Sequence, residues 1–253
     1  MKGKKRVVLF VSFFLLVALV TVAFFIWEGT GSEDPKKVQQ RDKQDSDVAY
    51  TELYSFTIAQ KERYDFVVII NPAHGGLELG ETIENVQEKN VVHQIAEQVR
   101  KENKDADIGI FLTRMTDTNP SEEQRRLLAE SMEADLWIDL HVIKQAEPES
   151  YGTAVYYPTE YYNPKLTNEN FADILERETV TSIEGIARGT FQEQENQFKY
   201  EILHNFTIPA AAVEIGNMEN AEEKNIMMQD EFYVKVAQGL LNGIYQVKQQ
   251  LAE

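Results

Sequence analysis

Cysteine is absent from the 253-residue chain, and histidine occurs only four times. The first absence excludes disulfide bonds, thiolate metal sites and cysteine nucleophiles. Any metal ion must therefore be held by histidine and carboxylate side chains. Glycine and proline are also scarce, with 13 and 7 residues, which excludes fibrous and low-complexity chains.

Positive charge is scarce as well, because 25 Lys and Arg stand against 42 Asp and Glu and the net charge is −17. A chain this acidic is repelled by a phosphate backbone, so we expect no nucleic-acid partner. The hydrophobic fraction of 43% nevertheless indicates a packed globular protein.

One long stretch, residues 7–27, contains no charged residue. A helix of this length, roughly 20 residues, matches the hydrocarbon core of a bilayer. Basic residues precede the stretch and acidic residues follow it, which places the amino terminus in the cytoplasm. We therefore expect residues 1–28 to form a cytoplasmic tip and a single-pass membrane anchor, with the rest of the chain outside the cell membrane. A cleaved signal peptide is the alternative, because residues 29–32 offer small side chains for cleavage.

Residues 29–64 are expected to connect the anchor to a domain. Polar and charged residues dominate up to position 47, which favours a flexible tether that buries no core. Apolar and aromatic residues return between positions 48 and 64, so this lead-in either packs on the domain or forms an early strand. The domain itself then occupies residues 65–253, a length suited to a single core.

Strand and helix patterns alternate through residues 65–253. Residues 66–70 are a continuous, mostly β-branched apolar run, typical of a strand buried on both faces. Ser121 and Gln124 have the spacing of a capping box at the start of a helix. The alternation predicts a single α/β domain with a largely parallel sheet flanked by helices. Further strands are expected at 108–112, 136–140, 153–157 and 210–215, and further helices at 89–99, 171–186 and 232–251.

Three reactive side chains lie at the ends of predicted strands. His74 follows the first strand after a turn, His141 directly follows another, and Glu214 lies near the end of a third. Ligands of open α/β sheets bind beyond the carboxyl ends of the strands, so these side chains should share one edge. Two histidines and a carboxylate form the usual catalytic zinc site. Spacing alone leaves the choice of carboxylate open, since Glu88 is equally well explained by a helix start.

A series of short motifs runs in order through residues 66–251. They are His74-Gly75-Gly76, Glu88-Lys89, Leu112-Thr113-Arg114 with Asp117, Arg125 with Ala129, Ala134-Asp135, His141, Gly152-Thr153 with Tyr156-Tyr157, and Pro209-Ala210 with Val213-Glu214-Ile215-Gly216 and Asn220. Together they resemble the zinc-dependent N-acetylmuramoyl-L-alanine amidases, a family of autolysins and of sporulation and germination enzymes.

The resemblance implies an enzyme that hydrolyses the amide between N-acetylmuramic acid and L-alanine in peptidoglycan. It implies one zinc ion bound by His74, Glu88 and His141, with Glu214 as the catalytic residue. His93 and His204 fall outside this ligand set. The resemblance leaves open whether an activator protein takes part.

Two departures from the family pattern lie beside the histidines. Asn71-Pro72-Ala73 stands where the family usually has Asp-Pro-Gly, and Asp139-Leu140-His141-Val142-Ile143 stands where it usually has Ser-Ile-His-Ala-Asn. Neighbours of metal ligands affect metal affinity and activity. The departures therefore leave two alternatives open: a weakened amidase-like domain that binds peptidoglycan or regulates another wall enzyme, and a zinc peptidase that cuts stem peptides.

Overall fold

The computed structural model describes residues 34–145, 151–160, 164–194, 199–204 and 206–252. The predicted membrane anchor at residues 7–27 lies outside these ranges. Within them, no helix combines the length and the apolar character needed to cross a bilayer. The chain divides into a short unit, Met1–Arg41, and a large unit, Asp42–Glu253. The large unit contains the sheet and the candidate site.

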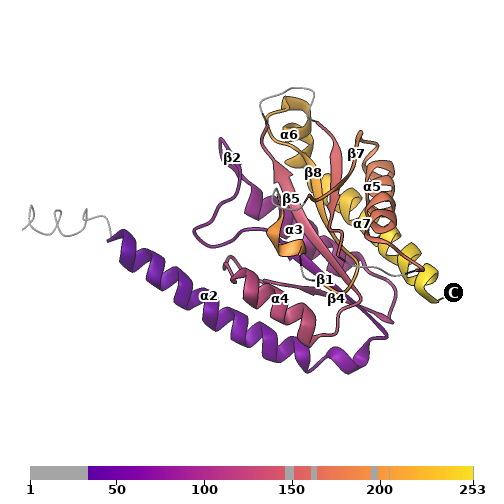
Figure 1. Cartoon of the computed structure of the whole chain (residues 1–253). Coiled ribbons are helices and arrows are strands. Elements are labelled where there is room, and N and C mark those ends of the chain that lie inside the picture. The colour runs from indigo at the N-terminus through magenta and orange to yellow at the C-terminus, as the bar shows by residue number, and fades with distance from the viewer. Residues whose placement is uncertain (1–33, 146–150, 161–163, 195–198, 205, 253) are drawn as a thin grey trace, which may run out of the picture. The chain divides into compact units, whose positions relative to one another are not determined.

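A six-stranded sheet with the order β4-β1-β5-β8-β6-β7 forms the centre of the large unit (Figure 1). Four of its neighbouring strand pairs are parallel, and β6 runs antiparallel to β8. The predicted α/β fold with a largely parallel sheet is thus confirmed, although the sheet is mixed. The strands are β1 (Phe66–Pro72), β4 (Ile108–Leu112), β5 (Leu136–Ile143), β6 (Thr153–Tyr157), β7 (Ala187–Gln192) and β8 (Ala210–Asn217).

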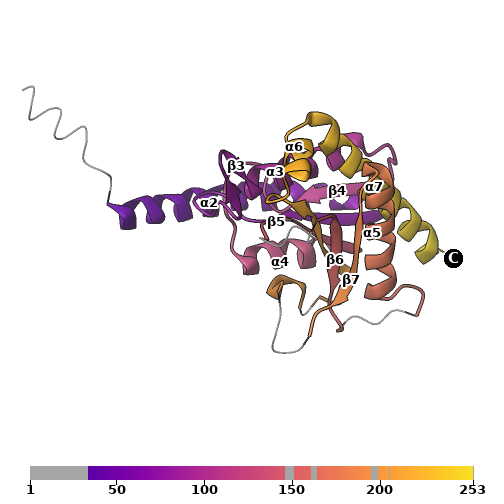
Figure 2. The same ribbon diagram turned by 90° about the horizontal axis from the view of Figure 1, so that it is seen from above.

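Helices cover both faces of this sheet (Figures 1 and 2). One face packs on α3 (Glu88–Glu102), α5 (Asn168–Ile183) and α7 (Asp230–Ala252), with the short α6 (Ala221–Met227) nearby. The other face packs on α4 (Glu122–Ser131) and the 3₁₀ helix η2 (Glu201–Leu203). Because neighbouring residues of a strand point to opposite faces, β1 contributes to both cores and reads as one apolar run.

The helix α2 (Pro35–Ile58) occupies much of the segment that was expected to be a tether. Asp34 precedes it and accepts a hydrogen bond from the backbone nitrogen of Lys36 at 3.0 Å, as a helix N-cap does, and Pro35 suits the first helical position. Ser46, Tyr50 and Thr57 are buried at helical spacing. The prediction of a flexible tether is therefore wrong from Pro35 onward, because Lys, Gln and Arg are strong helix formers despite their polarity. The lead-in packs on the domain as a helix, and no early strand forms there.

Replacing Tyr50 with Ala is expected to destabilise the large unit by about 2–4 kcal/mol, because a buried aromatic ring is lost from the core beneath α4. Chemical denaturation of the chain from residue 34 onward measures this. Phe56→Ala on the same helix is the control, since Phe56 is 66% exposed and should cost less than about 1 kcal/mol. Equal effects of the two variants would contradict the packing of α2.

The topology brings distant residues to one edge of the sheet. Strands β1, β5 and β8 are neighbours and run parallel, so their carboxyl ends meet at the same edge. His74 follows β1 after a single residue, and His141 on β5 lies opposite Glu214 on β8 in the register. A short hairpin of β2 (Thr82–Ile83) and β3 (Val86–Gln87) then leads into α3 at Glu88.

Candidate metal centre

Among the described residues, one cluster of side chains could hold a metal ion, and it consists of His74, Glu88 and His141. One potential ligand atom of each residue lies within 4.8 Å of the others. The Nε2 atom of His74 lies 3.1 Å from Glu88 Oε2, and the Nδ1 atom of His141 lies 3.0 Å from Glu88 Oε1. The two imidazole rings stand nearly perpendicular, with centroids 5.9 Å apart. The structure therefore brings together the three residues that the sequence singled out as ligands.

His74 occupies a tight loop with unusual backbone geometry. Its φ of 61° lies in the left-handed region, and Gly75 and Gly76 follow with φ of 138° and 53°. A non-glycine residue in this region carries strain that surrounding contacts must hold, a condition that often marks functional sites. Here the backbone oxygen of His74 accepts a hydrogen bond from Arg125 at 3.0 Å. The loop thereby points the imidazole toward Glu88.

Gly75→Ala is expected to destabilise the domain by about 2–4 kcal/mol and to weaken metal binding, because an added Cβ would lie 2.0 Å from the backbone oxygen of Thr118. Differential scanning fluorimetry and zinc titration measure the two effects. Gly189→Ala is the matched control, since Gly189 also has a positive φ but its Cβ would meet only ordinary contacts. If both variants melt at the same temperature, the clash at Gly75 is not the cause.

Glu88 is buried at the first turn of α3 and uses both carboxylate oxygens. Oε2 accepts from the backbone nitrogen of Glu81 at 2.9 Å, and Oε1 accepts from that of Val142 at 3.1 Å. Burial opposes the charge, but the hydrogen bonds and charges of His141 and His74 outweigh it and lower the pKa of Glu88 to about 2. The carboxylate is therefore ionised at neutral pH, as a metal ligand must be.

His141 is enclosed between carboxylates on its two nitrogens. Nδ1 faces Glu88, and Nε2 lies 3.1 Å from Asp139 Oδ2. Burial opposes the charged ring, but Asp139 and Glu88 outweigh it and raise the pKa of His141 to about 10. For His74, burial also opposes the charge, and hydrogen bonds to Glu88 and Glu78 raise its pKa. Carboxylates thus surround both imidazole rings with negative charge. A divalent cation can balance this charge as well as a proton can.

The donor set fits a zinc ion. Zinc–ligand distances near 2.0–2.1 Å in a tetrahedron place neighbouring donor atoms roughly 3.3 Å apart. The separations of the Glu88 carboxylate from the two histidine nitrogens, 3.1 Å to Oε2 and 3.0 Å to Oε1, are close to that spacing. One ligand atom of each of the three residues lies within 4.8 Å of the others, so small side-chain movements suffice to close the set around an ion. Two imidazoles and one carboxylate leave a fourth position for water or substrate, which is the arrangement of a catalytic site.

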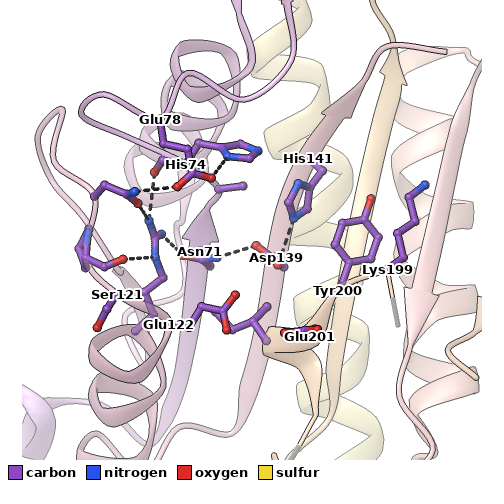
Figure 3. A pocket seen from close by; sticks show the side chains of 15 residues that line it. Asn71, His74, Glu78, Ser121, Glu122, Asp139, His141, Lys199, Tyr200 and Glu201 are labelled. Carbon is purple, nitrogen blue, oxygen red and sulfur yellow. Dashed lines mark hydrogen bonds and ion pairs between the residues drawn. The ribbon is translucent and has the colours of Figure 1, made fainter. Parts of the chain in front are cut away.

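A pocket of about 250 Å³ opens beside the two histidines (Figure 3). Its walls come from the loops after β1 and β4, the start of α4, strand β5 and the segment around η2. The lining residues are Asn71, Ala73, His74, Glu78, Asn119, Pro120, Ser121, Glu122, Arg125, Asp139, His141, Lys199, Tyr200, Glu201 and Ile202. The two candidate histidine ligands therefore face a space that a substrate can enter.

Glu214 lies next to His141 on the neighbouring strand, but it does not line this pocket. Its fully buried carboxylate accepts hydrogen bonds from Lys199 and Tyr200 on Oε1 and from Arg188 on Oε2. Lys199 and Tyr200 do line the pocket, and the Tyr200 ring lies 4.5 Å from that of His141. These two residues thus stand between Glu214 and the pocket.

Several of these partners had no role in the sequence-based predictions. Arg188, Lys199 and Tyr200 come from a stretch without periodic pattern, and only the fold places them on Glu214. Glu78 and Asp139 carried a weak signal, each lying within four positions of a ligand histidine. His93 and His204 do not belong to the ligand group found among the described residues.

The two departures from the amidase pattern prove to be partners. Asn71 and Asp139 lie opposite each other on β1 and β5, and Asn71 Nδ2 donates to Asp139 Oδ1 at 2.6 Å. Both side chains are buried. An amide facing a carboxylate satisfies both groups, whereas two carboxylates at this distance would repel each other. Asp139 is therefore compatible with Asn71, but it would not be compatible with the aspartate that the family usually has at that position.

Comparison with known proteins agrees with this geometry. A model of the N-acetylmuramoyl-L-alanine amidase family matches residues 68–246, well over half of the chain. The chain belongs to this family. Its reaction is therefore the hydrolysis of the amide between N-acetylmuramic acid and L-alanine in peptidoglycan.

Relatives of this amidase include enzymes of spore-forming bacteria. The germination-specific N-acetylmuramoyl-L-alanine amidase of Bacillus subtilis is 24% identical over 192 residues, which cover 70% of this chain and 78% of the relative. The sporulation-specific amidase of the same organism is 24% identical over 181 residues, covering 71% and 67%. The structure of the catalytic domain of an amidase from Bacillus (Paenibacillus) polymyxa matches with a TM-score of 0.64 and 25% identity, over 73% of this chain and 98% of that one.

Proposed function

We propose that this amidase works with one zinc ion held by His74 Nε2, His141 Nδ1 and the Glu88 carboxylate. The observation that carries the proposal is the convergence of these three donors within 4.8 Å at the edge of a pocket. Zinc bound there would supply a Lewis acid that polarises the scissile carbonyl and makes a bound water more acidic. The absence of cysteine and the scarcity of histidine leave few other ligands for such an ion.

Glu214 is the proposed proton carrier of the reaction. In hydrolysis the water oxygen bonds to the lactyl carbonyl carbon, the carbon–nitrogen bond breaks, and a proton ends on the alanine nitrogen. Glu214 would accept that proton from the attacking water and return it to the leaving nitrogen. Its position opposite His141 supports this role. Both Lys199 and Tyr200 donate to Oε1, so proton acceptance there requires one of them to give up its hydrogen bond. Lys199 is the more accessible of the two, since its side chain is 38% exposed.

Zinc content and product analysis together test the proposal. The chain from residue 34 onward, purified without chelator, should contain close to one equivalent of zinc. Digestion of purified peptidoglycan should release new amino-terminal alanine and leave the bonds within the stem peptide intact. Cleavage within the stem would instead identify a peptidase. Zinc binding without any cleavage, also after addition of wall extract, would favour the peptidoglycan-binding or regulatory alternative.

We also propose that residues 7–27 anchor the amidase in the cell membrane and leave its domain on the outer side. Support comes from the uncharged run and from the basic residues before it. Membrane fractionation and protease treatment of intact protoplasts test both parts. Release into the medium of a chain that lacks the residues before a cut at 29–32 would show a cleaved signal peptide. Protection of the membrane-bound chain from protease would contradict the orientation.

A further inference from the structure

Arg125 on α4 begins two series of contacting side chains, and each series ends at one of the two ligand histidines. Its guanidinium group is buried and donates one hydrogen bond to the amide oxygen of Asn71 and another, at 2.8 Å, to the amide oxygen of Asn119. A planar guanidinium can hold two acceptors at a fixed angle, which an ammonium group cannot do. Each asparagine begins one arm.

The first arm runs through the buried part of the sheet to His141. Asn71 receives hydrogen bonds on Oδ1 from Arg125 and from Thr113, so its Nδ2 group must face Asp139. Asp139 Oδ2 then lies 3.1 Å from His141 Nε2 as an ion-pair contact. This buried nitrogen has no aligned hydrogen bond to any described group, Asp139 included, so Asp139 acts on it through its charge and proximity.

The second arm runs along the pocket rim to His74. Asn119 accepts a hydrogen bond from Arg125 on Oδ1, and its Nδ2 group donates a hydrogen bond to Glu78 Oε2 at 2.8 Å. The other oxygen of Glu78 lies 2.6 Å from His74 Nδ1. Both arms therefore have the same order of groups: arginine, asparagine, carboxylate and histidine. Their surroundings differ, because the Glu78 side chain is 57% exposed and the Asp139 side chain only 2%.

Each arm decides which nitrogen of its histidine carries a proton. A carboxylate only accepts hydrogen bonds, so Glu78 requires a proton on Nδ1 of His74. The negative charge of Asp139, 3.1 Å away, favours a proton on Nε2 of His141. The unprotonated nitrogens are then Nε2 of His74 and Nδ1 of His141. These are the two atoms that face Glu88 at 3.1 and 3.0 Å.

We propose that Arg125, through Asn71–Asp139 and Asn119–Glu78, is a positioning residue that fixes opposite tautomers of the two zinc-binding histidines. This inference rests on the proposed zinc site and adds the groups that orient its ligands. The buried arm contributes more than the exposed arm, because solvent competes for Glu78 but not for Asp139. No residue of either arm needs to touch the metal or the substrate.

Nitrogen NMR of the zinc-loaded chain tests the tautomers directly. The chain has four histidines, and the variants His93→Gln and His204→Gln assign the two that are not ligands. The expected ring protons are on Nδ1 of His74 and on Nε2 of His141. Asp139→Asn should weaken zinc binding by roughly 10–100-fold in chelator competition, and Glu78→Gln should weaken it less. Combining these two changes should give a loss of binding free energy that differs from the sum of the single losses, since both arms meet at Arg125 and orient ligands of the same ion.

Arg125→Lys tests the residue at which both arms meet, and Arg126→Lys is its matched control. Arg126 is the next residue of α4 and pairs only with Glu130 at the surface among the described contacts, so its replacement should leave zinc affinity and ring spectra unchanged. Arg125→Lys should disturb the ring signals of both ligand histidines and lower zinc affinity. If that variant does not fold, Asn119→Leu replaces it, and it should disturb His74 while leaving His141 unchanged.

Several outcomes would overturn the inference. Ring protons at the same position in both ligand histidines would contradict opposite tautomers. Folded Asp139→Asn and Arg125→Lys chains with wild-type zinc affinity and wild-type ring spectra would remove the positioning role. A wild-type chain that binds no zinc overturns the proposed function, and this inference with it, before any variant is compared.

Discussion

Peptidoglycan hydrolysis by the Glu214→Gln variant is expected to be lower by about 10²–10⁴-fold, the range that a general acid–base residue supplies. Zinc content should stay near that of the wild type, because Glu214 is not among the three ligands. Release of amino-terminal alanine, measured at saturating peptidoglycan, gives the rate. The variant also faces Arg188 with an amide group, so a loss of stability of about 1–3 kcal/mol should accompany the change.

Glu201→Gln is the control for this experiment. Glu201 is an exposed glutamate that lines the pocket beside the two histidines, so the variant removes one negative charge from the site without touching the proposed proton carrier. It should retain activity within a few fold. If Glu214→Gln cleaves at the wild-type rate while Glu201→Gln loses activity, the proton carrier has been assigned to the wrong glutamate.

Replacing Glu88 with Gln should remove both zinc and activity. An apparent zinc binding free energy of about 10 kcal/mol, shared by three ligands, corresponds to a loss of affinity of roughly 10²–10³-fold when one is lost. The neutral amide also removes the negative charge that pairs with His74 and His141. Competition with a chelator measures the affinity, and the thermal shift on adding zinc should shrink with it.

Glu84→Gln provides the comparison for Glu88. Glu84 is an exposed glutamate in the β2–β3 turn, and it pairs with Lys224 away from the ligand group. Its replacement should change neither zinc affinity nor turnover. Full zinc binding by Glu88→Gln would show that the ion is held by other residues, and the proposed ligand set would be wrong.

The regular elements near the site were predictable from local patterns. The strand at β1 was evident because it is apolar on both faces, and the start of α4 was evident from Ser121 and Gln124, whose predicted capping box forms in the structure. Such signals lie within a few residues of one another and depend on backbone geometry alone. The same is true of the order of strands and helices that predicted an α/β fold.

Other elements could not be recognised in this way. The helix α2 has a polar sequence with few buried residues, so composition suggested a tether where helix propensity and packing against α4 produce a helix. Strand β7 has no fully buried residue and follows α5 directly, and its sequence ARGTFQ shows no clear alternation. The antiparallel direction of β6 depends on the connection between strands, which side-chain patterns do not encode.

The sequence by itself determined the chemical identity of the site. Without cysteine and with four histidines, the choice of ligands was small, and the ordered motifs around His74, Glu88, His141 and Glu214 indicated the amidase family before any coordinates. Only the tertiary structure decided how these side chains are held. The hydrogen bonds of Arg125, the pairing of Asn71 with Asp139 and the burial of Glu214 beneath Lys199 and Tyr200 join residues from separate elements. Hydrogen bonds act over about 3 Å, so they exist only after the sheet has brought these elements together.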